Sequence, residues 1–352
     1  MLSDRYKFSK NPILKLNPLQ FKTRDILADK IVNKTYCFEK VHCVVCGNPS
    51  EFEILAEKDR YGLDNVVVTC KKCGLVQTNP RFDQLSYNRF YKEDYRALYD
   101  GELKATDIFF RQQYYRGTII YKLISRFKEF SSLTKPFVLE VGCGAGGILK
   151  VFHEHGCQVK GIDLGEEYMQ YGKEKHGLDL QEGTVNNLKL DIKPDLVIYS
   201  NVLEHMTDPV AELKSVKRLI APDGLLFIEV PGIKNIHSNY RSDFLLYLQN
   251  AHTYHFSLTS LKNIFSLSGF EVLFGDEYIR TVSKIFTGNN PSSIANDFED
   301  VINYLKSAES KRKYYAFTLG GIKEALMSRG LKIADAIGIR GVLRKWRQGA
   351  SK

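Results

Sequence analysis

Residues 138–147 read Val-Leu-Glu-Val-Gly-Cys-Gly-Ala-Gly-Gly, and a helix-type stretch follows from Ile148 to His155. An apolar strand therefore runs into a glycine-rich turn that opens a helix. Glycine permits a positive φ and lets the backbone approach a ligand without a Cβ clash. Open α/β sheets bind ligands beyond the carboxyl ends of their strands, which is where this turn stands. The stretch predicts an α/β fold with a ligand beneath the turn.

From Phe137 to Gly232, short β-type runs alternate with helix-type stretches, as is typical of a parallel sheet covered by helices. The predicted strands are Phe137–Val141, Gln158–Ile162, Leu196–Tyr199, Leu225–Val230 and Phe270–Phe274. Ser257 is the predicted N-cap of a helix that precedes the last strand. Asp163 follows the second strand, where its carboxylate can accept hydrogen bonds from both hydroxyls of a ribose. These features alone leave a dinucleotide site open.

Four segments within residues 138–232 narrow the choice of ligand. They are Glu140–Gly146, Gly161–Asp163, Asp195–His205 and Pro222–Leu225. Their order and spacing closely resemble those of class I S-adenosylmethionine-dependent methyltransferases. The resemblance implies a Rossmann-like doubly wound sheet, S-adenosylmethionine as cofactor, and methyl transfer to an acceptor. Another use of a Rossmann-type fold and an inactive relative are the alternatives.

The resemblance also assigns cofactor-binding residues. Glu140 would orient the methionine amino group, Asp163 would bind the ribose, and Leu164 would flank the adenine. Thr184 stands where many relatives carry an acidic residue for the adenine amino group, which weakens that assignment. The other implied contacts are glycines under the methionine and ribose, and one residue beneath the methionine end: Gly142, Gly144, Gly146 and Asn201.

Two Cys-x-x-Cys pairs precede this domain. Such pairs supply four thiolates for a tetrahedral Zn²⁺. Gly47 and Gly74 follow the pairs, where a tight knuckle needs a permissive backbone. Four protein ligands would close the coordination shell, so the predicted site is structural; four unrelated buried cysteines are the alternative, and His42 is a less favoured ligand. The predicted zinc ligands are Cys43, Cys46, Cys70 and Cys73.

The segment Cys43–Tyr95 looks like the N-terminal region of methyltransferases that tailor sugars and cell-surface glycans. The resemblance implies O- or C-methylation of a sugar, nucleotide-sugar or cell-surface glycan precursor. An RNA methyltransferase that binds through the zinc module and a non-catalytic relative are the alternatives. Nucleic acid is not the expected partner, because residues 47–69 are not basic and Asn201-Val202-Leu203-Glu204 replaces an Asn-Pro-Pro-Tyr-type motif.

A proton acceptor for methyl transfer is expected just past the strand Leu196–Tyr199. In the sugar C-methyltransferases, a Glu-His pair here is implicated in acid–base work, which implies catalytic roles for Glu204 and His205. Quinone-ring O-methyltransferases use a similar pair to hold a divalent cation, with an acidic residue three positions earlier; here that position is Asn201. Helix capping or loop orientation is the alternative role of the pair. His255, favoured over His252, is the second expected catalytic group.

Charge is concentrated at the two ends of the chain. The net charge is +9, and residues 1–40 hold nine Lys/Arg against four Asp/Glu, while residues 304–352 hold twelve against three. These ends suit an anionic acceptor or surface. From Ala336 to Arg347, basic residues flank an apolar stripe, which predicts peripheral contact with an anionic membrane; packing on the catalytic domain is the alternative.

The predicted location is the cytoplasm, with peripheral contact at the inner membrane surface. The start of the chain lacks an apolar leader, and four of the seven cysteines lie in the two pairs, which favours a reducing compartment. The oligomeric state is left open. The expected organisation is an irregular basic N-terminal arm, a zinc-binding module, a helical connector, a class I methyltransferase domain and a helical basic tail, at residues 1–40, 41–80, 81–132, 133–287 and 288–352. Asn11-Pro12 and Asn17-Pro18 are interpreted as breaks in the arm.

Overall fold

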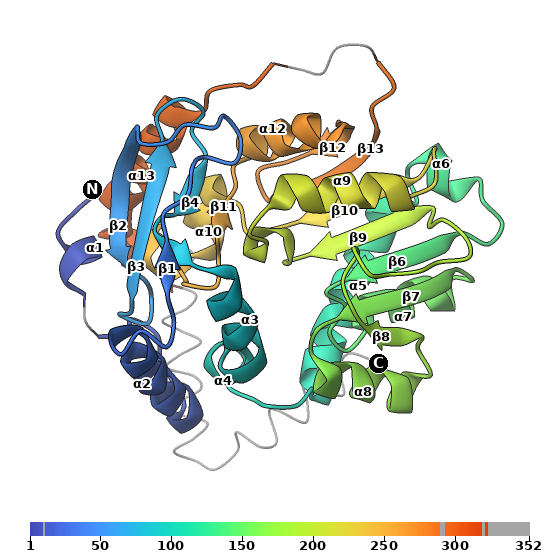
Figure 1. Ribbon diagram of the computed structural model, residues 1–352, viewed down its shortest axis with the longest axis horizontal. Helices are drawn as coiled ribbons and strands as arrows, with labels where there is room; N and C mark the ends of the chain where they lie inside the picture. Colours follow the sequence, from blue (N-terminus) through green and yellow to red (C-terminus); the bar gives the residue numbers. More distant parts are fainter. Residues whose placement is uncertain (10, 289–292, 319–320, 323–352) are drawn as a thin grey trace.

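The computed structural model describes residues 1–9, 11–288, 293–318 and 321–322. Its larger half is a seven-stranded sheet in the order β12-β13-β10-β9-β6-β7-β8 (Figure 1). Strand β13 runs antiparallel to both neighbours, and the other pairs are parallel. The strands are β6 (Phe137–Val141), β7 (Gln158–Asp163), β8 (Leu180–Glu182), β9 (Leu196–Ser200), β10 (Leu225–Glu229), β12 (Phe270–Gly275) and β13 (Arg280–Ile285).

The five predicted strands are all present, so the doubly wound α/β fold is confirmed. Every residue of the central strand β6 is buried, as expected for a parallel strand covered on both faces. The predicted cap is also present, because the Ser257 side chain accepts a hydrogen bond from Ser260 N at 3.1 Å. The covering helices are α5 (Asp107–Ile124), α7 (Gly147–Glu154), α8 (Glu166–His176), α9 (Pro209–Leu219) and α12 (Leu258–Ser268).

The N-terminal module has a sheet of its own, on the left in Figure 1. It contains β2 (Phe52–Lys58), β3 (Asp64–Cys70) and β4 (Val76–Thr78), and a small pair β1 (Phe38–Glu39) and β5 (Arg81–Phe82) lies beside it. A distant segment, β11 (Tyr254–His255), pairs antiparallel with β4 and completes a four-stranded sheet. The module and the chain beyond the parallel strands are therefore joined through one hydrogen-bonded sheet.

The predicted irregular structure of residues 1–40 is wrong for much of that segment. Helix α1 (Arg5–Phe8) is followed by α2 (Pro18–Val32). Asn17 accepts from Gln20 N, and the Gln20 side chain accepts from Asn17 N, which makes a capping box with Pro18 at the first helical position. Residues 81–132, the predicted helical connector, contain the helices α3 (Gln84–Glu93), α4 (Tyr95–Tyr99), α5 and α6 (Lys128–Ser131).

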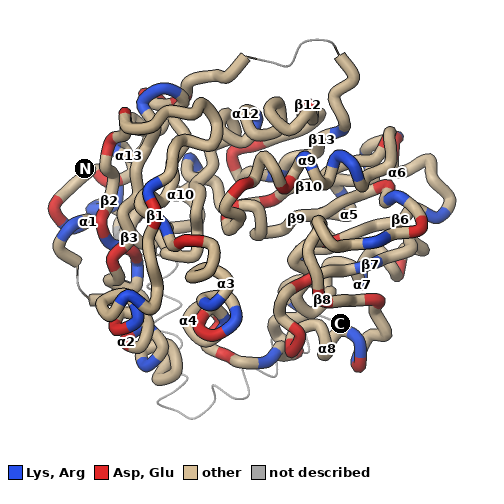
Figure 2. The backbone as a smooth tube through the Cα atoms, viewed as in Figure 1, with Lys and Arg blue, Asp and Glu red and all other residues tan. Residues whose placement is uncertain are grey.

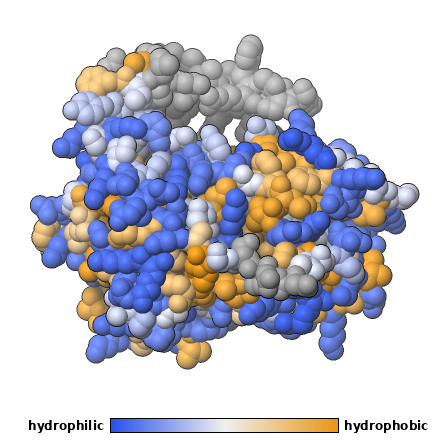
Figure 3. All heavy atoms as spheres, turned by 90° about the horizontal axis from the view of Figure 1, so that it is seen from above, coloured by the Kyte–Doolittle hydropathy of each residue, from blue (hydrophilic) through white to orange (hydrophobic). Residues whose placement is uncertain are grey.

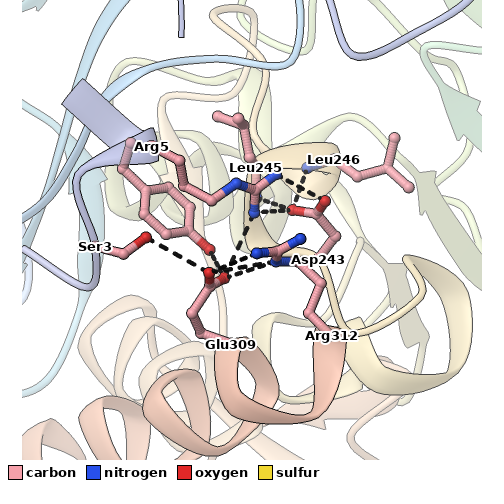
Figure 4. Close-up of polar contacts among 8 residues, drawn as sticks. Ser3, Arg5, Asp243, Leu245, Leu246, Glu309 and Arg312 are labelled. Carbon is pink, nitrogen blue, oxygen red and sulfur yellow. Dashed lines mark hydrogen bonds and ion pairs between the residues drawn. The ribbon is translucent and has the colours of Figure 1, made fainter. Parts of the chain in front are cut away.

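The chain after β13 returns to the N-terminal module. Helix α13 (Phe298–Arg312) joins a core with strands β2, β3 and β4 and with the short helices η2 (Ile233–Asn235), α10 (Ile236–Asn239) and α11 (Phe244–Tyr247). Figure 4 shows the polar side of this contact, where Arg5 binds both oxygens of Asp243 at 2.7 and 2.9 Å. Ser3, Arg5 and Tyr6 also reach Glu309 of α13. The first residues of the chain therefore link α11 to α13.

The face seen from above is largely hydrophilic, with groups of hydrophobic residues between (Figure 3). No helix among the described residues is long and apolar enough to span a membrane. The basic segment Ala336–Arg347, for which peripheral membrane contact was predicted, lies outside the described residues.

Candidate active site

The glycine-rich turn between β6 and α7 is packed so closely that side chains would not fit. Gly142, Gly144 and Gly146 have φ values of +72°, +54° and +76°. A Cβ on Gly142 would lie 2.3 Å from Val202 Cγ2, and one on Gly146 would lie 2.7 Å from Leu178 Cδ1. The turn therefore needs glycine both for its backbone conformation and for its contact with the segment after β9.

Asp163 lies at the carboxyl end of β7, next to this turn. Its Oδ2 accepts from Gly144 N at 2.7 Å, and its Oδ1 accepts from Gly165 N at 2.7 Å. An ionised carboxylate offers about four acceptor positions, so two such bonds leave room for ligand hydroxyls. The structure thus shows the Asp163 carboxylate holding the glycine turn against β7, and its contact with a ribose stays a prediction.

Glu140 is a buried acid within β6, only 1% exposed. Its Oε2 has no hydrogen-bond partner among the described residues. Burial raises the pKa of Glu140 well above its ordinary value, and the Arg116 guanidinium opposes that rise. A buried acid with an unpartnered oxygen costs free energy that a ligand donor could recover. Glu140 therefore fits the predicted contact with the methionine amino group.

Helix α5 contributes two residues that the sequence analysis missed. Gln113 donates from Nε2 to Cys143 O at 3.0 Å and accepts at Oε1 from Gly147 N at 3.2 Å, which clamps the glycine turn. Arg116, three residues later, lies 3.4 Å from Glu229 Oε1 at the end of β10. The sequence did contain a signal for these two residues. Gln113 and Arg116 are polar, three positions apart on the helix before the glycine-rich strand, and so lie on one helix face.

Three predicted cofactor-binding residues remain: Leu164, Thr184 and Asn201. Leu164 is 62% exposed beside Asp163. Asn187 Oδ1 accepts from Thr184 N at 2.8 Å and from Thr184 Oγ1 at 3.2 Å. Asn201 follows β9 with a φ of +55° and donates from its backbone to Glu229 O at 2.7 Å. The Thr184 side chain already bonds to Asn187, so its contact with the adenine amino group stays a prediction.

An acid and two histidines converge past the end of β9. Glu204 and His205 lie on the 3-10 helix η1 (Leu203–His205), and Glu204 Oε1 lies 3.8 Å from His205 Nε2 and 3.9 Å from His252 Nε2. His205 Nδ1 lies 2.9 Å from Ala251 O. A carbonyl can only accept, so Nδ1 carries the proton and Nε2 carries the lone pair. His205 therefore presents a basic nitrogen beside Glu204.

Burial keeps this cluster uncharged. It raises the pKa of Glu204 to about 8 and lowers the pKa of His205 to about 4. It also lowers the pKa of His252 well below the usual value. Neither Glu204 oxygen has a hydrogen-bond partner among the described residues. The lowered pKa values favour neutral imidazoles at pH 7, and the hydrogen bond to Ala251 O leaves the lone pair of His205 on Nε2.

His255 lies outside this cluster, although the sequence analysis favoured it over His252. Its ring is centred 5.8 Å from the His252 ring and 5.2 Å from the Tyr247 ring. Neither ring nitrogen has a partner among the described residues, and burial lowers the pKa of His255 to about 3. The reason is the strand β11, which fixes His255 opposite Val76 while the preceding loop brings His252 to Glu204.

The four predicted zinc ligands meet in the N-terminal module. Their sulfur atoms lie within 4.8 Å of one another, with Cys43 to Cys73 at 3.4 Å and Cys46 to Cys70 at 3.5 Å. The backbone of each knuckle closes in the same way, through Gly47 N to Cys43 O and Gly74 N to Cys70 O, both at 2.8 Å. Four sulfurs bound to one zinc at 2.3 Å would be about 3.8 Å apart, so the set fits that ion.

Comparison with known protein families gives a match for much of the part that forms the seven-stranded sheet. Residues 112–273 match a family whose description is methyltransferase domain. This chain carries a class I S-adenosylmethionine-dependent methyltransferase domain. The match begins on α5, so it includes Gln113 and Arg116 as well as the predicted cofactor residues.

Curated relatives match only part of the chain. One is a ubiquinone biosynthesis O-methyltransferase from Haemophilus ducreyi, 36% identical over 102 residues, which are 26% of this chain and 43% of the relative. Another, of the same description, is from Hydrogenovibrio crunogenus and is 28% identical over 127 residues, 34% of this chain and 50% of the relative. The chain thus spans half or less of the length of these relatives.

Solved structures resemble the methyltransferase domain weakly. The amino pentose methyltransferase CalS10 from Micromonospora echinaspora is 15% identical, covers 54% of this chain and 95% of its own, and has a TM-score of 0.39. An S-adenosylmethionine-dependent methyltransferase from Clostridium acetobutylicum is 14% identical, covers 57% of this chain and 99% of its own, and also scores 0.39.

Proposed function

We propose that this chain transfers a methyl group from S-adenosylmethionine to a sugar, nucleotide-sugar or cell-surface glycan precursor. The observation that carries the proposal is the close approach of two constellations at the carboxyl ends of β6 and β9. One is the glycine turn with Glu140 and Asp163, and the other is the cluster of Glu204, His205 and His252.

The cofactor half of the site fits S-adenosylmethionine. The glycine turn has the positive φ values of a ligand-binding turn, Asp163 offers acceptors for ribose hydroxyls, and Glu140 offers an unpartnered oxygen to an amino group. Leu164, Thr184 and Asn201 remain proposed contacts. When bound, this cofactor supplies an electrophilic methyl group, and the protein contributes mainly the positioning of the acceptor.

The part of the site that would bind the acceptor contains a base and neighbouring aromatic rings. His205 Nε2 has the lone pair needed to take a proton from a hydroxyl or a carbon acid, and Glu204 lies beside it. The rings of Tyr91 and Tyr95 each lie 5.8 Å from the His205 ring. His255 remains a proposed second group. The glycan class of the acceptor rests on the sequence resemblance of Cys43–Tyr95.

The N-terminal module is proposed to hold one structural zinc ion on Cys43, Cys46, Cys70 and Cys73. All four ligands come from the protein, so the ion would have no open position for substrate. Asn48 Nδ2 donates to Cys70 Sγ at 3.2 Å, a contact of the kind that orients metal-bound thiolates.

Figure 2 bears on the alternative of an RNA methyltransferase. Basic and acidic residues are interspersed along the described chain, including on α2, rather than gathered in one basic stretch. Nucleic-acid readers usually carry a concentrated basic patch. Salt-sensitive binding of RNA would nevertheless replace the glycan proposal.

The direct test has two stages. Calorimetry should show S-adenosylmethionine binding to the purified full chain, and absence of binding would contradict the proposed function. Mass spectrometry of nucleotide-sugar and glycan pools, from cells with and without the gene, should then reveal a species that differs by one methyl group. Unchanged pools would exclude the proposed acceptor class while leaving the cofactor assignment intact.

A further inference from the structure

We propose that Arg60, on the turn between β2 and β3, binds an oxyanion of the acceptor, either a phosphate or a carboxylate. The N-terminal module would thereby complete the acceptor site in addition to holding zinc. This inference rests on the proposed function, because it specifies the chemistry of the acceptor at the same site.

The turn is attached directly to the loop that carries His252. Arg60 N donates to Leu248 O at 3.1 Å, and Asn250 N donates to Asp59 Oδ2 at 3.3 Å. The Arg60 Nη2 group donates to Gln249 Oε1, and the Gln249 amide donates in turn to His252 Nε2. One amide side chain therefore separates the Arg60 guanidinium from the cluster of Glu204, His205 and His252.

Aromatic rings hold the guanidinium in this position. The Arg60 Cζ atom lies 5.2 Å from the centre of the Tyr61 ring and 5.6 Å from the Tyr99 ring. The Tyr99 ring contacts that of Tyr95 at 4.9 Å, and Tyr95 borders His205. Contacts through Tyr95 and Tyr99 therefore connect the proposed base, His205, with Arg60.

The Arg60 guanidinium has an N–H donor, at Nε, without a hydrogen-bond partner, and it forms no salt bridge with a carboxylate of the described residues. The adjacent carboxylate of Asp59 is occupied, since Oδ1 accepts from Tyr61 N at 2.9 Å and from Leu63 N at 3.0 Å. The Asp59 charge interacts with Arg60, but its oxygens bond to backbone amides rather than to the guanidinium, so the unpartnered Nε donor is available to an anionic ligand.

An oxyanion is the ligand that this arrangement suits. A guanidinium presents a planar fork of donors that matches phosphate and carboxylate oxygens. Its stacking on two rings restricts the fork before the ligand arrives, which reduces the entropy lost on binding. A nucleotide-sugar would offer phosphate here, and an acidic sugar would offer carboxylate.

The experiment measures binding of inorganic pyrophosphate and of glucuronate to the full chain by calorimetry. The variants are Arg60→Gln, which removes the charge, and Arg60→Lys, which keeps the charge but loses the fork. Arg89→Gln is the matched control, because Arg89 is exposed and, within the described part of the chain, its side chain donates to Thr35 O at the surface. Affinity for S-adenosylhomocysteine is measured for every protein, and circular dichroism checks each fold.

Wild type and Arg89→Gln should bind one of the two anions saturably, with a roughly tenfold or greater loss in Arg60→Gln and a smaller loss in Arg60→Lys. The cofactor product should bind all four proteins equally. Equal anion binding by wild type and Arg60→Gln, or no saturable binding of either anion by wild type, would overturn the role of Arg60. Failure of wild type to bind S-adenosylhomocysteine would instead contradict the proposed function. If Arg60→Gln does not fold, the Arg60→Lys comparison decides.

Discussion

At the scale of single residues, Asp163 holds the glycine turn and is the proposed acceptor for the ribose hydroxyls, and one substitution would remove both roles. Replacing Asp163 with alanine deletes the acceptor for ribose hydroxyls and the bond to Gly144 N. Charge-assisted hydrogen bonds contribute about 1.5–3 kcal/mol each, so S-adenosylmethionine binding should weaken at least about tenfold. Calorimetry measures this. Asp179→Ala, at an exposed ion pair with Lys160, is the control, and equal affinities in both variants would refute the assignment.

His205 should control turnover without affecting cofactor affinity. If its Nε2 takes the proton, His205→Ala should lower the turnover number by roughly 10²–10⁴. Because burial lowers the pKa of His205 to about 4, the acidic limb of kcat/KM should lie well below pH 6.5. Steady-state rates with the identified acceptor, measured across pH, check both expectations. Retained turnover would transfer the role to His252 or His255.

Glu204 should make the folded state less stable as pH rises. Burial raises its pKa to about 8 from 4.5, so the folded chain binds this proton more tightly than the unfolded chain. That contribution is fully present below about pH 4.5 and is lost as pH rises through about 8. Glu204→Gln should therefore gain free energy of unfolding relative to wild type between about pH 5 and pH 8. Urea unfolding at both pH values measures the difference, and a constant gap would contradict it.

The positions of predicted site residues followed from the sequence where those residues lie close together in the chain. Glu140, the three glycines and Asp163 sit in one strand–turn–helix unit and at the end of the next strand, so their positions follow from periodicity. Gln113, Arg116 and His252 reach the site from segments whose approach depends on tertiary packing. Sequence spacing does not contain that information.

At the scale of elements, the predicted strands fall within one residue of the observed ones. For β6, β9 and β10 the reason is that buried strands with parallel neighbours read as continuous apolar runs. Helix α2 was missed for a physical reason. Asn17-Pro18 was interpreted as a break, whereas asparagine is a good N-cap and proline is favoured at the first helical position. Residues that end one element can begin the next.

The zinc knuckles allow an element-scale prediction. Metal analysis of reduced protein should find one zinc per chain, and Cys70→Ser should lower the zinc content and the free energy of unfolding. S-adenosylmethionine binding by the fraction that remains folded should change little. Cys37→Ser is the control, because Cys37 is exposed and outside the cluster. Absence of zinc in wild type would argue against the site.

At the scale of the whole molecule, the Arg5 network fastens the start of the chain to parts more than two hundred residues away. The pair with Asp243 is partly buried, with side chains 23% and 17% exposed. Arg5→Ala should therefore cost about 1–3 kcal/mol, more than a surface ion pair would. Lys7→Ala, on an exposed position of the same short helix, should cost less. Urea unfolding compares them, and equal midpoints would show that the network contributes nothing.

The pairing of β4 with β11 has a consequence for synthesis on the ribosome. Strand β4 ends at Thr78, and its partner begins only at Tyr254. At typical translation speeds, roughly ten seconds or more separate the emergence of the two strands. Throughout that interval, one edge of β4 lacks its native partner, and an unpaired edge can recruit other chains. A nascent chain stalled before residue 254 should therefore depend on chaperones more than the finished protein does.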